Sequence, residues 1–154
     1  MDIYEKARGI AANYIGARMY TCREIEDRLR RKGIDKDTAE QVVADFAKIG
    51  ALDDRLYAEA YVNQAIRLSA KGAYRIRQEL YAKGVARSII DDVLADTSED
   101  TEAALSEYIE SHRLCENISS RRDLEKLKAR LARRGFSPSE IRECLGKYDF
   151  ELED

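Results

Sequence analysis

The sequence predicts an all-α protein made of three tandem three-helix repeats, and three observations support this prediction. Gly33, Gly84 and Gly135 stand 51 residues apart. Each follows an amphipathic segment and precedes an apolar residue, which is the pattern of a Schellman cap at a helix C-terminus. The chain has a single proline, which favours helices over a turn-rich β-sandwich. Repeats of this size stack on their neighbours, so we expect an elongated, curved array.

Apolar residues at helical spacing predict where the helices lie. Thr21 with Glu24, and Ser137 with Glu140, form the pattern of a capping box at a helix start. The polar segment 96–101 is expected to be a connector. The predicted helices cover 1–16, 21–32, 36–48, 55–68, 71–83, 87–95, 102–114, 120–134 and the stretch from 138 onward.

The 51-residue shift also relates apolar positions in the three copies, such as Ile25, Ile76 and Leu127. Helices in general share a 3.6-residue period, but they do not share the same glycine stop at the same spacing. We therefore divide the chain into repeats at 1–51, 52–99 and 100–149, followed by an acidic tail at 150–154.

Charge is distributed unevenly among the predicted helices. The whole chain carries −3, which argues against a general nucleic-acid binder. The middle helix of each repeat is basic, at +2, +3 and +5, so the remainder carries −13. Stacked repeats would place these helices in one row and produce a basic stripe for a partner protein or DNA. Its candidate members are Arg28, Arg31, Lys32, Lys71, Arg75, Arg77, Lys83, Arg121, Lys126, Arg130, Arg133 and Arg134.

The stripe has two interpretations. In the first interpretation the stripe is a solvated face, because the helix dipole favours basic residues near helix C-termini. In the second it binds phosphate or an acidic protein groove through charge-assisted contacts, and the recurrence in all three copies favours this one. Tyr74 and Tyr81 share a face of the middle helix of the second repeat. Their rings could stack on nucleic-acid bases or pack against a neighbouring helix, and we expect packing.

The sequence contains no recognisable catalytic motif, and we expect no enzyme, cofactor or metal site. Asp53 and Asp54 stand at a helix start, where capping is favoured over acid–base or metal chemistry. Cys22, Cys115 and Cys144 are widely spaced, which indicates reduced thiols in a cytoplasmic protein, and His112 is the sole histidine. No signal peptide or membrane span is expected.

The chain resembles the RecX family over nearly its whole length, and the resemblance is specific in the middle third. The resemblance rests on residues 50–58 (GALDDRLYA) and on Lys71-Gly72, Arg75-Ile76, Glu79-Leu80 and Lys83-Gly84-Val85. Arg28-Leu29 with Lys32-Gly33-Ile34, and residues 131–137 with Ile141, resemble the first and third repeats of that family. Tyr57 stands where the family pattern has phenylalanine, and residues 21–25 match less closely.

This resemblance implies a bacterial, cytoplasmic regulator of the RecA recombinase with three three-helix repeats. Such proteins bind the groove of the RecA filament on DNA without catalysis. They inhibit strand exchange, ATP hydrolysis and coprotease activity, and so modulate DNA repair, recombination and the SOS response. We expect a monomer whose partner is the RecA filament, with single- or double-stranded DNA as a further contact. Two alternatives stay open: a sequence-independent nucleic-acid-binding module and a generic helical-repeat adaptor.

Overall fold

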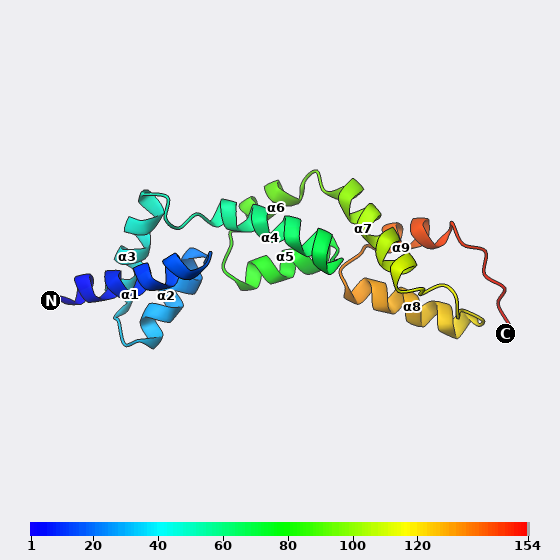
Figure 1. The fold of residues 1–154 in the computed structure, drawn as a ribbon, viewed down its shortest axis with the longest axis horizontal. Helices are drawn as coiled ribbons and strands as arrows, with labels where there is room; N and C mark the ends of the chain where they lie inside the picture. Colours follow the sequence, from blue (N-terminus) through cyan, green and yellow to red (C-terminus); the bar gives the residue numbers. More distant parts are fainter. Residues whose placement is uncertain (154) are drawn as a thin grey trace. The chain divides into compact units, whose positions relative to one another are not determined.

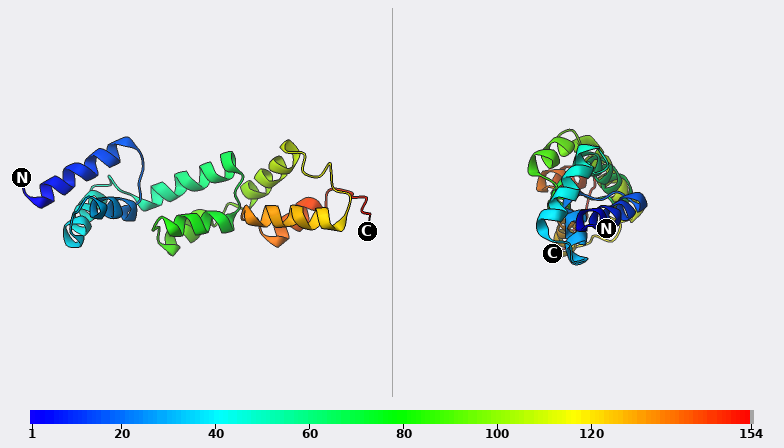
Figure 2. Two further views of the ribbon diagram at one scale, coloured as in Figure 1. Left: turned by 90° about the horizontal axis from the view of Figure 1, so that it is seen from below. Right: turned by 90° about the vertical axis from the view of Figure 1, so that its left-hand side faces the viewer.

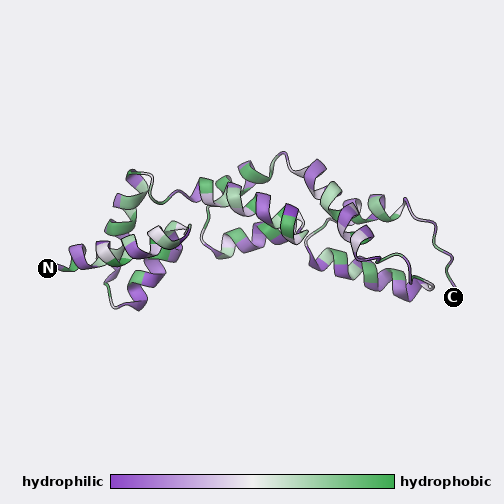
Figure 3. Ribbon diagram, viewed as in Figure 1, coloured by the Kyte–Doolittle hydropathy of each residue, from purple (hydrophilic) through white to green (hydrophobic). Residues whose placement is uncertain are grey.

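The computed structural model describes residues 1–153, and these form nine α-helices with no strand, which confirms the all-α prediction (Figure 1). Figure 3 shows hydrophilic and hydrophobic turns alternating along the helices, as expected of amphipathic segments. No helix in the described chain is long and apolar enough to cross a membrane. The helices are α1 (Ile3–Ala17), α2 (Cys22–Arg31), α3 (Lys36–Lys48), α4 (Asp54–Ser69), α5 (Ala73–Ala82), α6 (Arg87–Leu94), α7 (Ser98–Ser111), α8 (Arg121–Arg133) and α9 (Pro138–Leu145).

The glycine after each middle helix has the predicted Schellman geometry. Gly33, Gly84 and Gly135 have φ of 90°, 90° and 98°, a region that favours glycine. In the turn after α5, the N–H of Val85 donates to the carbonyl of Leu80 at 3.1 Å, and the N–H of Gly84 donates to that of Tyr81 at 3.0 Å. Equivalent pairs of bonds close the turns after α2 and α8. The sequence signal therefore defines the end of each middle helix.

Two predicted helix starts are confirmed, and one is wrong. Thr21 and Ser137 form complete capping boxes with Glu24 and Glu140. The predicted connector 96–101 is partly helical, because α7 begins at Ser98. Polar and acidic residues are favoured in the first turn of a helix, so this polar run is also a good helix start.

The first compact unit comprises residues 1–60 and 80–91. In it α1, α2 and α3 enclose a core that includes Ile25, Leu29 and Val42, each fully buried. Both views in Figure 2 show α1 beside α2 and α3. Ile3, the first residue of α1, is 48% exposed, so it lies outside this core.

The second compact unit comprises residues 61–79 and 92–153. Its core lies among α7, α8 and α9, with Leu105 and Leu131 fully buried and Phe136 nearly so. Phe150 of the predicted acidic tail packs against this core, and the N–H of Glu153 donates to the carbonyl of Ser119 at 2.6 Å. Asp154, the last residue of that tail, lies outside the described residues.

Within the first unit, the N-terminus of α2 contacts the glycine turn that follows α5. The hydroxyl of Thr21 donates to the carbonyl of Lys83 at 2.6 Å, and the Lys83 ammonium lies 3.9 Å from the Glu24 carboxylate. Arg23 lies so close to Gly84 that a Cβ there would be 2.5 Å from the Cβ of Arg23. We call such a contact, between one middle helix and the next glycine turn, a repeat joint.

The second unit contains the same joint one repeat later. The N–H of Gly72, just before α5, donates to the carbonyl of Arg134 at 2.8 Å, and that of Tyr74 donates to Gly135 at 3.2 Å. Adding 51 to the positions of Thr21 and Lys83 gives Gly72 and Arg134. The periodicity of the sequence therefore produces two equivalent contacts between consecutive repeats.

The aspartates at the start of α4 have separate roles. Asp53 accepts the N–H groups of Arg55 and Leu56 at 3.0 and 3.1 Å, which is the expected cap. Asp54 instead accepts the N–H of Cys22 at the start of α2, at 2.9 Å. Its carboxylate thus satisfies a free donor at the end of another helix and strengthens the first repeat joint.

Candidate interaction surface

Helix α8 presents one basic face to solvent. Arg122, Lys126 and Arg133 are exposed, and their spacing of four and seven residues places them on the same side of the helix. None of the three side chains makes a hydrogen bond or ion pair with any residue that the structure describes. Three cations in this arrangement are available to bind anionic groups of a partner.

A groove beside this face runs between α8 and α9. It has a volume of about 390 Å³ and is lined by Ala129, Ala132, Pro138 and Ile141, with charged residues at its rim. The alanines are small, which leaves room between the two helices. The surface therefore combines an apolar groove with neighbouring positive charge.

Two other predicted members of the stripe on α8 have structural partners. Arg130 donates to the hydroxyl of Tyr108 from Nη2 at 2.8 Å and from Nε at 3.2 Å. The guanidinium of Arg134 lies 4.4 Å from the centroid of the same ring, and it donates to the carbonyls of Ser69 and Ala70, the latter at 3.1 Å. Arg134 thus satisfies backbone groups around the left-handed Ala70, whose φ is 46°.

The basic residues at the N-terminal end of α5 are largely neutralised by Glu79. The Lys71 ammonium bonds both carboxylate oxygens of Glu79, at 2.9 and 3.0 Å, and Arg75 lies 3.6 Å away. Tyr61 donates to the same carboxylate at 2.8 Å. Partial burial raises the pKa of Glu79, but the bonds from Lys71 and Tyr61 and the charge of Arg75 outweigh it, so the pKa lies below the usual value.

We expect the Glu79 cluster to make stability depend on pH in the acidic range. The lowered pKa means that its stabilisation is present above the unfolded-state pKa, about 4.3, and is lost as pH falls through the folded-state value. Glu79→Gln should therefore reduce stability at pH 7 and flatten its acid dependence. Urea midpoints measured by circular dichroism between pH 3 and 7 test this. Parallel curves for the two proteins would contradict it.

In the first repeat, only some members of the predicted stripe have side chains without a partner among the described residues. The guanidinium of Arg28 lies 4.9 and 5.0 Å from the rings of Tyr14 and Tyr20, a cation–π arrangement. Arg31 and Lys32, at the C-terminal end of α2, are exposed and make no ion pair or hydrogen bond through their side chains with the described residues. The prediction that the stripe binds a partner therefore rests here on these two.

The remaining predicted members of the stripe, Lys83, Arg77 and Arg121, are partly or fully exposed and also interact within the chain. Lys83 contacts Glu24 in the first repeat joint. Arg77 and Arg121 are exposed, and each also interacts within the chain. The prediction that all these residues contact a partner stays a prediction, and the structure separates exposed cations from those that stabilise the fold.

Tyr74 and Tyr81 are 59% and 54% exposed, so the expectation that they pack against a neighbouring helix is wrong. They stand on the polar face of α5, away from Ile76 and Leu80, which are fully buried. The Arg87 guanidinium lies 5.2 Å from the ring of Tyr81. These exposed rings remain accessible for stacking with a base or a partner side chain.

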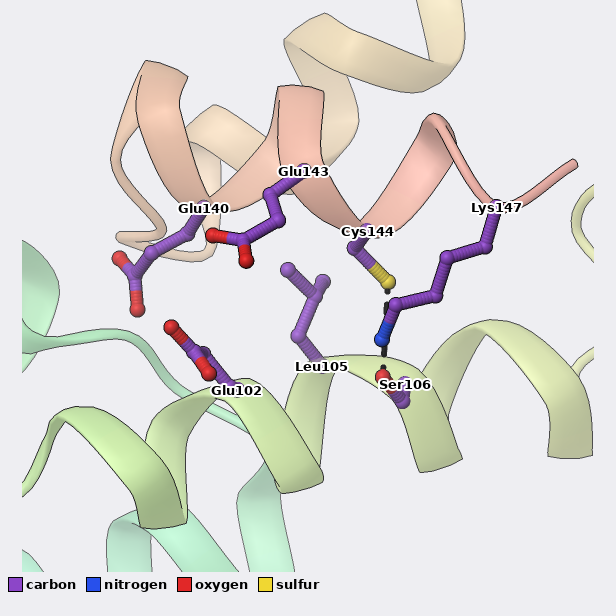
Figure 4. A pocket seen from close by; sticks show the side chains of 7 residues that line it. All are labelled: Glu102, Leu105, Ser106, Glu140, Glu143, Cys144 and Lys147. Atoms are coloured by element: carbon purple, nitrogen blue, oxygen red, sulfur yellow. Dashed lines mark hydrogen bonds between the residues drawn. The ribbon is translucent and has the colours of Figure 1, made fainter.

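The pocket between α7 and α9 is too small for a substrate (Figure 4). Figure 4 shows Glu102 opposite Glu140 and Glu143. A hydrogen bond joins Ser106 Oγ and Cys144 Sγ, which lie 3.5 Å apart. Its volume is about 20 Å³, room for a single water. Among the described residues, no group of three or more His, Cys, Asp or Glu could hold a metal ion.

The surroundings of the three thiols and of His112 indicate structural roles for these side chains. All three cysteines are free. Burial, followed by the charge of Asp54, raises the pKa of Cys22 to about 12, so this thiol is not a ready nucleophile. The His112 ring lies 4.4 Å from that of Tyr108, and its Nδ1 is 3.0 Å from the Tyr108 carbonyl oxygen.

The sequence-based prediction of the stripe missed two exposed arginines whose side chains have no ion pair or hydrogen bond with the described residues. Arg122 shares the free face of α8 with Lys126 and Arg133, and Arg30 is exposed beside Arg31 on α2. The four-residue spacing from Arg122 to Lys126 is a signal that helical periodicity carries.

Comparisons with known proteins agree with this architecture. Family models of the first and second three-helix domains of RecX match residues 7–46 and 53–94. Regulatory protein RecX of Chlorobium phaeobacteroides is 30% identical over 141 residues, 92% of each chain. That of Leuconostoc citreum is 32% identical over 139 residues, and the chain spans about half of its length (52%). A crystal structure of RecX from Lactobacillus salivarius matches with a TM-score of 0.80 and 27% identity, covering 95% of this chain and 96% of that one.

The helices, their three glycine turns and the repeat joints define the class of this protein as an all-α repeat protein built from three-helix domains. Two matched domains and a relative aligned over almost its whole length then identify the family. The chain belongs to the RecX family of regulatory proteins.

Proposed function

We propose that this chain binds the RecA recombinase filament and inhibits its strand-exchange, ATPase and coprotease activities. The observation that carries the proposal is the membership of the RecX family, because the relatives described above are named regulatory proteins. In this proposal the chain acts in the cytoplasm as a monomer, without catalysis, and thereby modulates DNA repair and recombination.

The free basic face of α8 is the surface that best fits such a partner. Arg122, Lys126 and Arg133 have no competing carboxylate contact in the described chain, so binding does not require an internal ion pair to break. A filament on DNA offers both acidic side chains and phosphates, which arginine binds through charge-assisted hydrogen bonds. The groove between α8 and α9 accepts an apolar side chain next to these charges.

A double charge reversal on the α8 face should weaken inhibition. For Lys126→Glu with Arg133→Glu, we expect the concentration for half-maximal inhibition of RecA ATPase on single-stranded DNA to rise about tenfold, because two charge-assisted contacts become repulsive. The assay is a titration of the protein into RecA at several salt concentrations. Circular dichroism checks that the variant remains folded.

The matched control is Lys36→Glu with Lys48→Glu. Both lysines are exposed on α3, so this variant has the same net charge as the test variant but leaves α8 intact. It should inhibit like the wild type. If the two double variants inhibit equally well, the α8 face is not the contact surface.

A second candidate function is direct binding of single-stranded nucleic acid. It is supported by the exposure of Tyr74 and Tyr81 on a helix that also carries Arg75 and Arg77, since exposed rings beside cations suit base stacking. A binding assay with single-stranded DNA alone separates the two functions. Salt-sensitive binding to single-stranded DNA without RecA would favour the second, whereas inhibition of RecA without such binding favours the first.

A further inference from the structure

The glycine turn after α2 is open, although the two equivalent turns are covered. An ideal Cβ at Gly84 would meet Arg23, and one at Gly135 would meet Arg75 and Gly72. At Gly33, which has the same φ of 90° as Gly84, no atom of the described residues other than the glycine and its chain neighbours lies within 4 Å of that position. The turn keeps the geometry of the turns in the repeat joints, but no helix N-terminus of residues 1–153 contacts it. We call residues 31–34 the open turn.

We propose that the open turn binds the N-terminus of a helix from a partner protein, with a hydroxyl residue at its N-cap and a glutamate three residues later. Both repeat joints show what covers such a turn. In the first joint an N-cap hydroxyl donates to the carbonyl of Lys83, and in the second a backbone N–H donates to that of Arg134. A partner helix would supply the same donors to the carbonyl of Lys32, its equivalent 51 residues earlier.

The glutamate follows from the charges around the open turn. Lys32 is equivalent to Lys83, whose ammonium lies 3.9 Å from Glu24, the glutamate of a capping box. Lys32 is exposed and has no such partner among the described residues. Asp54, whose carboxylate accepts the N–H of Cys22 in the first joint, has Ile3 as its equivalent 51 residues earlier, so this carboxylate is lost at the open turn. An acidic helix start complements this environment and fits the direction of its own dipole.

A second copy of this chain fits the open turn poorly. Two helix starts of this chain come close to the required pattern. That of α9 has Ser137 and Glu140, but Glu140 already accepts a hydrogen bond from the Thr101 hydroxyl at 2.9 Å. That of α8 has Ser120 as its N-cap and Asp123 three residues later, but Arg121 and Arg122 stand between them. It would bring two cations to a turn that already carries Arg31 and Lys32. Moreover, the position equivalent to Thr21 and Gly72 is Asp123, which lies within α8 rather than before it. The helix is longer at this end, so the same joint does not form.

NMR on the full chain tests the proposal with a defined probe. The probe is an acetylated alanine–lysine helical peptide of about 16 residues that begins Ser-Ala-Ala-Glu, a capping box. At peptide concentrations of about 1 mM, we expect the amide signals of Lys32 and Gly33 to shift, while those of Gly84 and Gly135 stay in place because their turns are already covered. Lys32→Glu should weaken the interaction about fivefold.

Two controls make the outcome decisive. Arg133→Glu changes the same charge on α8 and should leave the Gly33 shift intact, and a peptide with glutamine in place of glutamate should bind more weakly. Absence of a Gly33 shift at the highest peptide concentration, equal shifts at all three turns, or no effect of Lys32→Glu would each overturn the proposal. So would self-association of the protein alone that Lys32→Glu abolishes, because the occupant is then a second copy. None of these outcomes depends on whether the chain binds RecA.

Discussion

Gly135→Ala should destabilise the protein by about 3–5 kcal/mol, one of the largest effects expected of a single substitution here. Its φ of 98° already costs an alanine about 1–2 kcal/mol. In addition, the new Cβ would lie 2.5 Å from the backbone nitrogen of Arg75 and 2.8 Å from the carbonyl oxygen of Gly72. Both are backbone atoms in the second repeat joint, so they cannot move away without breaking it.

Gly33→Ala is the matched control for this substitution. It imposes similar backbone strain, but the new Cβ has no atom within 4 Å from the described residues other than its own chain neighbours. We therefore expect a loss of only about 1–2 kcal/mol. Urea unfolding followed by circular dichroism at 222 nm gives both midpoints. Equal losses for the two variants would show that the joint does not contribute to stability.

Arg133→Ala and Arg134→Ala should have opposite consequences, although the two residues are adjacent. Arg134→Ala removes charge-assisted hydrogen bonds to the carbonyls of Ser69 and Ala70 and the contact with the Tyr108 ring, so we expect a loss of about 2–4 kcal/mol. Arg133 is exposed and has no side-chain partner in the described chain, so its removal should change stability by less than about 0.5 kcal/mol.

The two substitutions should have the reverse order of effects on inhibition of RecA. Under conditions in which both variants are folded, Arg133→Ala should weaken inhibition of RecA more than Arg134→Ala, because only Arg133 belongs to the free face. Thermal unfolding and the ATPase titration, performed on the same preparations, measure the two properties. If Arg134→Ala retains full stability while inhibition is lost, Arg134 is a partner-binding residue after all.

The repeats and helix ends were predictable because they depend on local chemistry. A glycine followed by an apolar residue, as at Gly84 and Val85, has one geometric solution after an amphipathic helix. Capping boxes such as that of Thr21 and Glu24 are equally local. The start of α7 was missed because polar residues such as Ser98 and Asp100 are compatible both with a loop and with the first turn of a helix.

The candidate surface was only partly predictable because charge alone does not tell whether a side chain has a partner. Helical spacing placed Arg130 and Arg133 near the same surface, but Tyr108 on another helix engages only the first. Likewise, the carboxylate of Glu79 binds Lys71, a residue eight positions away that precedes α5. Contacts of this kind depend on tertiary packing, which the repeat pattern does not specify.

The repeat joints also affect how independently the repeats can fold. The first compact unit takes the C-terminal end of α5 and the second takes its N-terminal end, so the middle repeat belongs to neither unit alone. A chain truncated after α6 would lose the acceptors for the N–H groups of Gly72 and Tyr74 and would leave a helix start uncapped. The middle repeat is therefore not a transplantable module, and we expect its loss of structure to be cooperative with that of its neighbours.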